Sequence, residues 1–341
     1  EMSQGLLQAV FEFQTMIAEL CGLPLANASL YDGATAAVEA ALMAADQTKR
    51  RRILAARTLH PHYREVLRTH LRPRGLELVE LPVKNGRLEP DDLQLDAETA
   101  ALIAGYPNFF GQIEDLGPLA GAVHAAGARL IAVANPIALG ILEAPGALGA
   151  DLVVGEGQPL GSWPCFGGPG LGFMACREEF LRRLPGRLVG QTADAGGRRG
   201  FVLTLQTREQ HIRRERATSN ICSNAALLAL RAAIYLSVLG PDGLRAVAEA
   251  SAAAAHYAAG RLCAGGRFSL LFPGAYFHEF ALRTPVPPAR LNDVLLRKGI
   301  IGGLDLAPYY PELGPAMLLA CTEMTSAGDI ERLVRVMEGA A

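Results

Sequence analysis

Lysine is scarce in this sequence, and neither sign of charge is in excess. Lysine occurs only at Lys49, Lys84 and Lys298, whereas lysine and arginine together number 32 and the acidic residues number 34. The formal net charge of −2 provides no basic field that would attract nucleic acid or an anionic membrane surface. We therefore expect neither as a partner.

Long apolar runs and paired cysteines are lacking as well. No run approaches the ~18 uninterrupted apolar residues that a membrane-spanning helix needs, and the first four residues lack the basic, then apolar, pattern of a secretory signal. The six cysteines are scattered without metal-ligand spacing. We expect reduced, mostly buried thiols, no metal site and a cytoplasmic location.

The sequence does contain enough apolar residues, 50%, for a large core. Helix-like and strand-like stretches alternate to about residue 173, which favours an α/β fold around a largely parallel sheet. The helices before this point are expected at Gln8–Leu20, Thr35–Ala45, Tyr63–Leu71 and Leu119–Ala126. The strands are expected at Arg52–Ala56, Leu76–Leu81, Ala101–Ala104, Arg129–Ala134, Leu152–Gly155 and Leu171–Met174.

A second, smaller α+β domain is predicted at the C-terminal end. It begins with an apolar helix, Ala225–Leu239, that ends at Gly240 and Pro241. The division is therefore a large domain over residues 1–224 and a linker helix with a small domain over residues 225–341. Within the large domain, the glycine- and arginine-rich segment Gly186–Asn224 is predicted to be a functional or interface loop; the alternative is an ordinary surface loop. Small-domain elements are expected at Phe277–Leu282, Pro288–Lys298, Met317–Cys321 and Asp329–Met337.

Gly33, Ala34 and Thr35 lie where a turn meets the start of a predicted helix. Free backbone N–H groups and the helix dipole at such a position suit an anionic phosphate, and Thr35 adds a hydroxyl. The alternative is an ordinary helix start with Asp32 or Thr35 as the N-cap residue.

Two asparagines and two histidines follow predicted strands. Asn108 and Asn135 stand at carboxyl ends of strands, where open parallel sheets bind ligands; turn formation beside proline is the alternative. His60 and His62 lack the further ligands of a metal site. A histidine on such a loop could instead stack on a planar cofactor ring, or serve only loop hydrogen bonds.

The segment from residue 204 to 222 concentrates Arg208, Arg213, Arg214 and Arg216 with His211. Such a face is usually solvated or paired with neighbouring carboxylates, here Glu209 and Glu215. A second reading is contact with an acidic partner, because arginine binds carboxylates in a fork geometry.

Several long motifs together resemble one known family. They are "YPNFFGQIEDL", "GQPLGSWPCFGGPGLGFMA" and "TLQTREQHIRRERATSNIC", with the opening stretch from residue 1 to 36. These resemble subunit 1 of the two-chain form of the glycine cleavage system P-protein, over nearly the whole chain and in order. Because the chain opens at what looks like an interior motif of the family, we expect a further N-terminal segment to belong to it.

The resemblance implies the aminotransferase-like fold type I of enzymes that depend on pyridoxal phosphate (PLP). In that fold a lysine after a late strand binds the cofactor, and an aspartate holds its ring nitrogen. The position that the resemblance assigns to the lysine is Gln158 or a near neighbour, and Asn135 stands for the aspartate. Glutamine cannot form an imine, and neutral asparagine cannot stabilise a protonated ring by charge.

The family reaction is decarboxylation of glycine and transfer of an aminomethyl group to the lipoyl H-protein. The resemblance therefore implies a supporting subunit without covalent cofactor, in an α2β2 heterotetramer whose second subunit supplies the PLP lysine. Thr218, Ser219 and Asn220 are candidates for reaching the partner's site, and Gly33, Ala34, Thr35, His60, Asn108, Asn135 and Gln158 for a vestigial or cross-subunit pocket. Alternatives are an independent PLP enzyme, an aminotransferase or lyase, and a structural or regulatory pseudoenzyme.

Overall fold

The large domain is built on a seven-stranded mixed sheet. The computed structural model describes residues 3–340 and gives the strand order β1-β7-β6-β5-β4-β2-β3. Strands β2 to β6 pair parallel with one another, whereas β7 pairs antiparallel with both β6 and β1. The strands are β1 (Leu25–Ala26), β2 (Arg52–Ala56), β3 (Glu77–Leu81), β4 (Thr99–Tyr106), β5 (Arg129–Ala134), β6 (Leu152–Glu156) and β7 (Gly172–Cys176).

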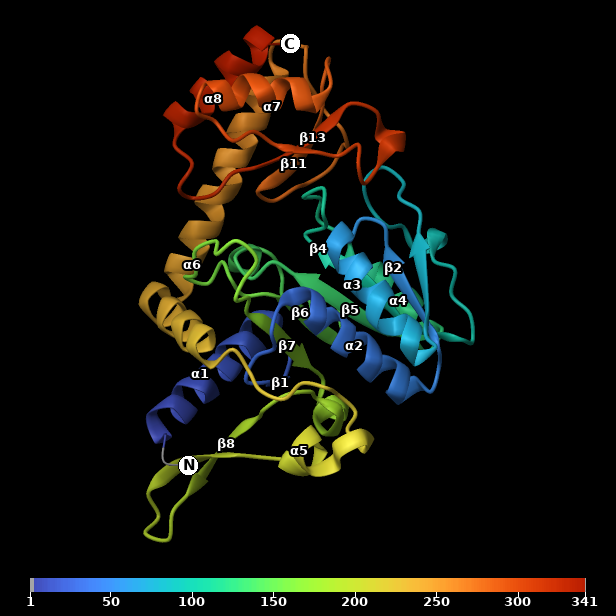
Figure 1. Ribbon diagram of the computed structural model, residues 1–341, viewed down its shortest axis with the longest axis vertical. Helices are drawn as coiled ribbons and strands as arrows, with labels where there is room; N and C mark the ends of the chain where they lie inside the picture. The colour runs from blue at the N-terminus through green and yellow to red at the C-terminus, as the bar shows by residue number, and fades with distance from the viewer. Residues whose placement is uncertain (1–2, 341) are drawn as a thin grey trace.

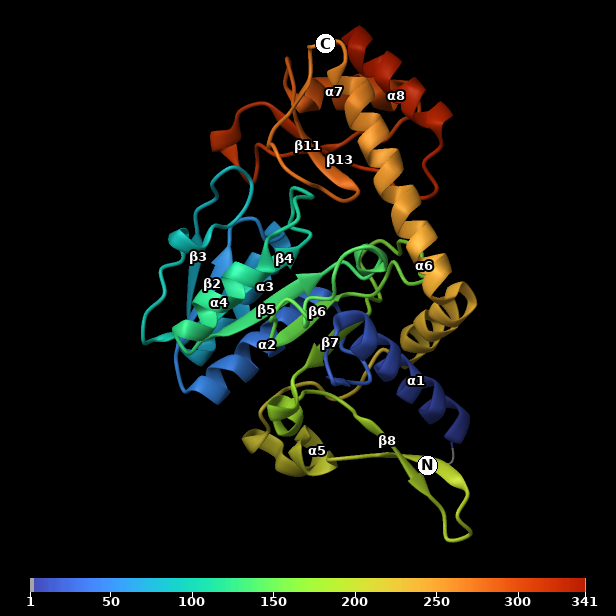
Figure 2. The same cartoon turned by 180° about the vertical axis from the view of Figure 1, so that it is seen from behind.

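Helices cover both faces of this sheet, as Figures 1 and 2 show from opposite sides. One core cluster joins α2 (Gly33–Thr48) and α3 (Pro61–Leu71) to the sheet, and the other joins α1 (Gln4–Cys21) and α4 (Leu116–Ala125) to its opposite face. Every residue of β4 is buried, because a central strand covered on both faces needs a continuous apolar run. The predicted parallel strands and their helices are thus present.

The segment predicted as a loop between Gly186 and Asn224 contains a β-hairpin, so that prediction was wrong for its first half. Strands β8 (Val189–Ala193) and β9 (Arg199–Leu203) pair antiparallel around a turn at Gly197. Val189 and Phe201 pack on the residues of α1, far away in the sequence. The hairpin forms because α1 supplies the apolar surface that these short strands lack by themselves.

The helix α6 (Ala226–Cys263) leads from the large domain into the small one (Figures 1 and 2). At Gly240 the backbone adopts φ 61° and ψ −175°, which turns the chain, and Pro241 then restarts the helix. The predicted helix end at Gly240 is therefore a kink within a longer helix. By length and composition alone α6 is apolar enough to cross a membrane, and 28% of its apolar window is buried inside the protein. The helix packs against α1 and against α8 (Ala327–Ala340).

The small domain is a four-stranded antiparallel sheet of order β10-β11-β13-β12 with α7 (Pro288–Arg297) and α8 against it. Its core combines the second half of α6 with residues of β11, α7, β13 and α8. The strands are β10 (Ser269–Leu270), β11 (Glu279–Arg283), β12 (Leu304–Asp305) and β13 (Ala316–Ala320).

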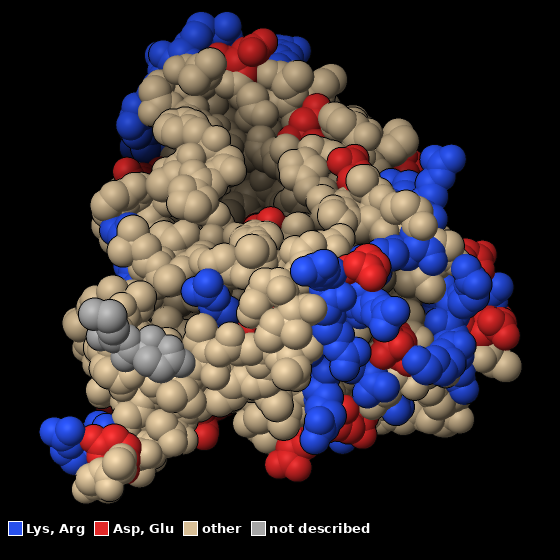
Figure 3. Space-filling model, turned by 60° about the horizontal axis from the view of Figure 1, so that its bottom comes forward, with Lys and Arg blue, Asp and Glu red and all other residues tan. Residues whose placement is uncertain are grey.

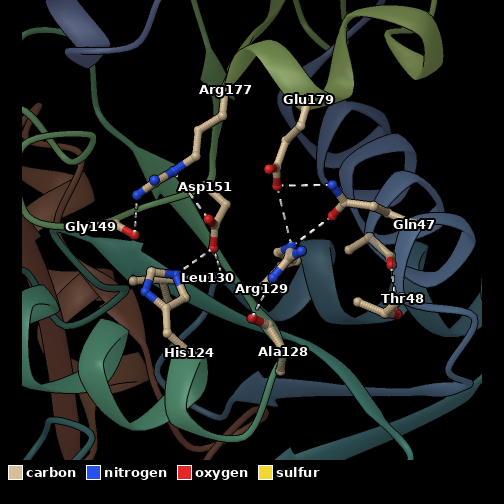
Figure 4. A network of polar contacts seen from close by, with 11 residues as sticks. Gln47, Thr48, His124, Ala128, Arg129, Leu130, Gly149, Asp151, Arg177 and Glu179 are labelled. Carbon is tan, nitrogen blue, oxygen red and sulfur yellow. Dashed lines mark hydrogen bonds and ion pairs between the residues drawn. The ribbon is translucent and has the colours of Figure 1, made fainter.

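A buried carboxylate fixes the start of β6, the strand that leads into the glycine-rich loop. Figure 4 shows Asp151 between His124 and Arg177, beside the first residues of β5. Its Oδ2 accepts hydrogen bonds from the Leu130 backbone N–H and from His124 Nε2, each at 2.8 Å, and Arg177 Nε lies 3.1 Å from its Oδ1. The network fixes where β6 begins relative to β5, and thereby where Glu156 lies at the other end of β6.

Candidate functional site

A cleft of about 230 Å³ lies at the carboxyl ends of β4, β5 and β6. Three of the residues singled out in the sequence, His60, Asn108 and Asn135, line it together, with Glu156 and Glu279. This is the edge at which an open parallel sheet binds ligands. Figure 3 shows the molecule hollowed between its two domains, with mainly uncharged side chains around the hollow.

His60 is the N-cap residue of α3, and its Nδ1 accepts a hydrogen bond from the His62 backbone N–H at 3.2 Å. Its ring meets Phe109 edge-on, with 4.9 Å between ring centroids. Burial, then the neighbouring His62 and Arg64, lowers the pKa of His60 to about 4. The imidazole is therefore neutral at neutral pH and presents a flat, uncharged ring to the cleft.

Asn108 is buried and fully engaged within the protein. Its Nδ2 donates to Glu114 Oε1 and to the Gly86 carbonyl, each at 2.8 Å, and its Oδ1 accepts from the backbone N–H groups of Phe110 and Gln112. These contacts are those of a turn-forming asparagine, the alternative reading of the sequence.

Asn135 links the two domains. Its Oδ1 accepts from the Ile137 N–H at 3.0 Å, and its amide nitrogen lies 3.1 Å from His278 Nε2, just before β11. The other ring nitrogen of His278 lies 2.9 Å from the Cys321 carbonyl, and burial lowers the pKa of His278. A neutral ring that donates to Cys321 through Nδ1 can accept from Asn135 through Nε2. Asn135 thus holds the domain contact beside the cleft.

The start of α2 carries protein carboxylates where the sequence predicted a phosphate. The Gly33 N–H donates to Glu156 Oε2 at 3.0 Å, and the Thr35 N–H donates to Asp32 Oδ1 at 2.9 Å. The Thr35 hydroxyl donates to the Asp32 carbonyl at 3.1 Å. Asp32 is the N-cap residue, which is the ordinary helix start named as the alternative.

Gln158 does not line the 230 Å³ cleft but borders the clefts on either side of the glycine-rich loop. One, of about 830 Å³, is bounded by Tyr31 and the loop itself, and the other, of about 410 Å³, lies between the domains. Lys49 and Lys84 form ion pairs with Asp46 and Asp92. Among the described residues 3–340, no lysine lines any of these three clefts.

Thr218, Ser219 and Asn220 do not join the cleft at the sheet edge. Thr218 borders a separate cleft of about 480 Å³ that several arginines and Lys49 surround, and Asn220 is exposed. Ser219 is buried; its Oγ accepts from the Ile221 N–H at 3.0 Å. Burial raises the pKa of the neighbouring Glu39, while a hydrogen bond from Ser219 lowers it.

The arginine-rich segment has its Arg213, Arg214 and Arg216 at the surface. His211 Nδ1 lies 3.7 Å from a carboxylate oxygen of the buried Glu209. In Figure 3 basic side chains gather over one side of the large domain with acidic ones between them. Mixed charges of this kind are typical of a solvated face.

The cysteines are all free thiols, but only Cys21, Cys176 and Cys321 are buried. Cys165, in the glycine-rich loop, and Cys222 are exposed, which corrects the expectation of mostly buried thiols. Within residues 3–340 no group of three or more histidine, cysteine, aspartate or glutamate side chains is placed to hold a metal ion.

Comparison with known proteins identifies the family. A sequence model described as glycine cleavage system P-protein matches residues 1–337. The chain is 52% identical over 339 residues to a probable glycine dehydrogenase (decarboxylating) subunit 1 of Desulfitobacterium hafniense, covering 99% of this chain and 76% of that protein.

The fold agrees with two solved structures. The crystal structure of a glycine decarboxylase (P-protein) of the glycine cleavage system, in inhibitor-bound form, superposes with a TM-score of 0.95 at 46% identity, covering 99% of this chain and 77% of that chain. The sphingosine-1-phosphate lyase of Burkholderia pseudomallei superposes with a TM-score of 0.73 at 17% identity, covering 98% of this chain and 77% of that chain, which shows the fold alone.

The sheet, its helices and the cleft at the strand ends are those of the fold type I class of PLP enzymes. Within this class, the chain belongs to the glycine cleavage system P-protein family. The expectation drawn from its motifs is confirmed for both family and fold.

The residues of this chain do not fit the cofactor of its fold class. The segment Gly157–Leu160, which follows β6, contains no lysine. The Asn135 amide supplies no negative charge for a protonated ring nitrogen and is already bonded to His278. A third disagreement is Glu156 itself, whose carboxylate occupies the start of α2. Sequence reasoning missed Glu156; the only local signal was an acidic residue at the end of an apolar strand.

Proposed function

We propose that this chain is the subunit of a heteromeric glycine dehydrogenase (decarboxylating) that carries no cofactor lysine, and that the second subunit binds PLP covalently. When bound there, PLP supplies the electron sink that decarboxylation of glycine requires. The observation that carries the proposal is that the segment directly after β6 contains no lysine, in a chain that otherwise keeps the family fold. On this reading the chain alone is inactive.

Exposed apolar side chains beside the glycine-rich loop support a partner on this face. Phe166 is fully exposed, and Trp163 is 65% exposed with the Arg231 guanidinium 4.0 Å from its ring centroid. On the first half of α6, Leu227 and Val238 are 75% and 79% exposed. Aromatic and arginine side chains anchor protein interfaces when a partner desolvates them, and apolar groups gathered in one patch mark such sites.

The remaining parts of the assembly complete the proposal. The relatives named subunit 1 imply a second subunit, and we place the two in an α2β2 heterotetramer in the cytoplasm. Glycine is the substrate and lipoyl H-protein the acceptor of the aminomethyl group. Light scattering of the mixed subunits tests the stoichiometry, and retention of this chain on immobilised H-protein tests the acceptor.

The decisive experiment is glycine–bicarbonate carbon exchange, measured with PLP on the full chain alone, the lysine-bearing subunit alone, and the two mixed. Activity only in the mixture supports the proposal; activity of this chain alone overturns it. Borohydride reduction followed by peptide mass spectrometry then locates the lysine that carries the cofactor. Finding it at Lys49, Lys84 or Lys298 would contradict the assignment to the second subunit.

A further inference from the structure

Glu156 ties together three segments that surround the expected cofactor position. It is the last residue of β6. Its Oε2 accepts from the Gly33 N–H at 3.0 Å, at the start of α2. Its Oε1 accepts from the Gln158 N–H at 3.0 Å and from the Leu171 N–H at 2.7 Å, on the two sides of the glycine-rich loop. At Gly33 the carboxylate thus occupies a helix N-terminus, a position that favours a bound anion, and it accepts two further N–H groups from the loop.

The space beside Gly33 is already filled. A Cβ added to Gly33 would lie 2.0 Å from the Tyr63 hydroxyl oxygen and 2.7 Å from the Glu156 backbone nitrogen. Burial raises the pKa of the Tyr63 hydroxyl, and the Glu156 and Asp32 carboxylates raise it further. A phosphate at this helix start would therefore need to displace protein atoms and would meet two negative charges.

The charged side chains that line the neighbouring 230 Å³ cleft are also acidic. Glu156 and Glu279 both line the 230 Å³ cleft, whereas no lysine or arginine among the described residues does. Burial raises the pKa of Glu279 to about 7, so this carboxyl carries only part of a negative charge near neutral pH. A phosphate-bearing ligand would find no cation in this cleft to offset its charge.

We propose that Glu156 is a built-in anion: its carboxylate takes the place of the cofactor phosphate at the start of α2 and excludes phosphate, and with it PLP, from this chain. The inference concerns this chain alone and holds whether or not a partner carries the cofactor. The internal carboxylate already satisfies the N–H groups of Gly33, Gln158 and Leu171.

The test uses the full chain, inorganic phosphate as the probe, and the backbone amide resonances of Gly33 and Leu171 as site-specific reporters. In the wild type, millimolar phosphate should leave both resonances unchanged. In Glu156→Ala, the Gly33 resonance should shift with phosphate, with a dissociation constant at least about tenfold lower than in the wild type. The exposed Glu249 on α6 supplies the matched control, Glu249→Ala, which should behave as the wild type.

Two outcomes would overturn the proposal: phosphate shifting the Gly33 resonance in the wild type, or Glu156→Ala gaining no more affinity than Glu249→Ala. Should Glu156→Ala fail to fold, Glu156→Ser takes its place, because serine is nearly as short and its hydroxyl can still accept one of the three N–H groups. Phosphate should then shift the Gly33 resonance in Glu156→Ser but not in Glu249→Ala. Equal behaviour of these two variants would contradict the proposal.

Discussion

Replacing Asp151 by alanine tests how β6 is held, and the structure sets the expected cost. The side chain of Asp151 is only 5% exposed, and its carboxylate accepts the backbone N–H of Leu130, a residue with no exposed surface. The side chains of its two other partners, His124 and Arg177, are more accessible, at 35% and 43% exposed. Water reaches other parts of both side chains, but neither Arg177 Nε nor the Leu130 N–H is exposed.

The loss divides into two parts. A buried N–H group left without an acceptor costs about 1–3 kcal/mol. The contacts to the two partly exposed partners add roughly 0.5–1 kcal/mol together, the range of solvent-exposed ion pairs. We expect Asp151→Ala to lower the free energy of unfolding by about 2–4 kcal/mol. Asp151→Asn keeps an acceptor for Leu130 and should cost about half as much.

Urea unfolding followed by circular dichroism measures this difference, with Asp46→Ala as the matched control. Asp46 also pairs with two cations, Lys49 and Arg183, each at 2.7 Å, but its side chain is 43% exposed. The control should therefore lose no more than about 1 kcal/mol. Equal losses of unfolding free energy in the two alanine variants would mean that the burial of Asp151 does not increase its contribution to stability.

Three further predictions concern pH, packing and thiol chemistry. Burial raises the pKa of Glu114 from an ordinary 4.5 to about 7, so the folded chain binds this proton more tightly than the unfolded chain. The free energy of unfolding should therefore fall as the pH rises from 4.5 to about 7, and it should fall less steeply in Glu114→Gln. Gly155→Ala places a Cβ 2.3 Å from a backbone carbonyl oxygen and should cost about 1–3 kcal/mol in urea unfolding, whereas Gly5→Ala meets nothing within 4 Å and should not destabilise. Cys165 and Cys222 should react fastest with a thiol reagent, and more slowly once the second subunit is added.

Each of these predictions has an outcome that contradicts it. An unchanged pH slope in Glu114→Gln would remove that carboxyl as its source. A Gly155→Ala variant as stable as Gly5→Ala would mean that the strands around Gly155 move apart without a loss of unfolding free energy. If the labelling rates of Cys165 and Cys222 do not change when the second subunit is added, the partner binds on another face.

The inner strands β4 and β6 could be predicted because they are buried on both faces and are nearly unbroken apolar runs, whereas the edge strand β3 is only partly buried. The start of α2 could also be predicted, since Asp32 caps it through a contact three residues away. The β8–β9 hairpin could not, because its stability comes from α1, far earlier in the chain. Gly240 and Pro241 give equal signals for a helix end and a helix start, and only packing shows that both occur.

The candidate site was predictable only where a rule of topology applied. His60, Asn108 and Asn135 follow strands, and the strands bring them to one cleft. The role of Glu156 depends on Gly33, which lies 123 positions away in the sequence. Thr218, predicted from the resemblance to reach the partner's site, lies at a different cleft of this chain, and its reach toward a partner stays a prediction.

The kink in α6 is a point at which a small rotation would move the small domain over a larger distance. From Gly240 to Cys263 the helix extends about 34 Å, so a rotation of about ten degrees at the kink would carry its far end through roughly 6 Å. A side chain at Gly240 itself would meet nothing within 4 Å, whereas Leu236 before it and Leu244 after it are buried in the large-domain core. Contacts farther along the small domain also resist such a rotation. They include the pair of Asn135 and His278 and the backbone hydrogen bond from the Phe277 N–H to the Gly111 carbonyl. A small change in the packing at the kink would therefore be felt as a large displacement at these distant contacts.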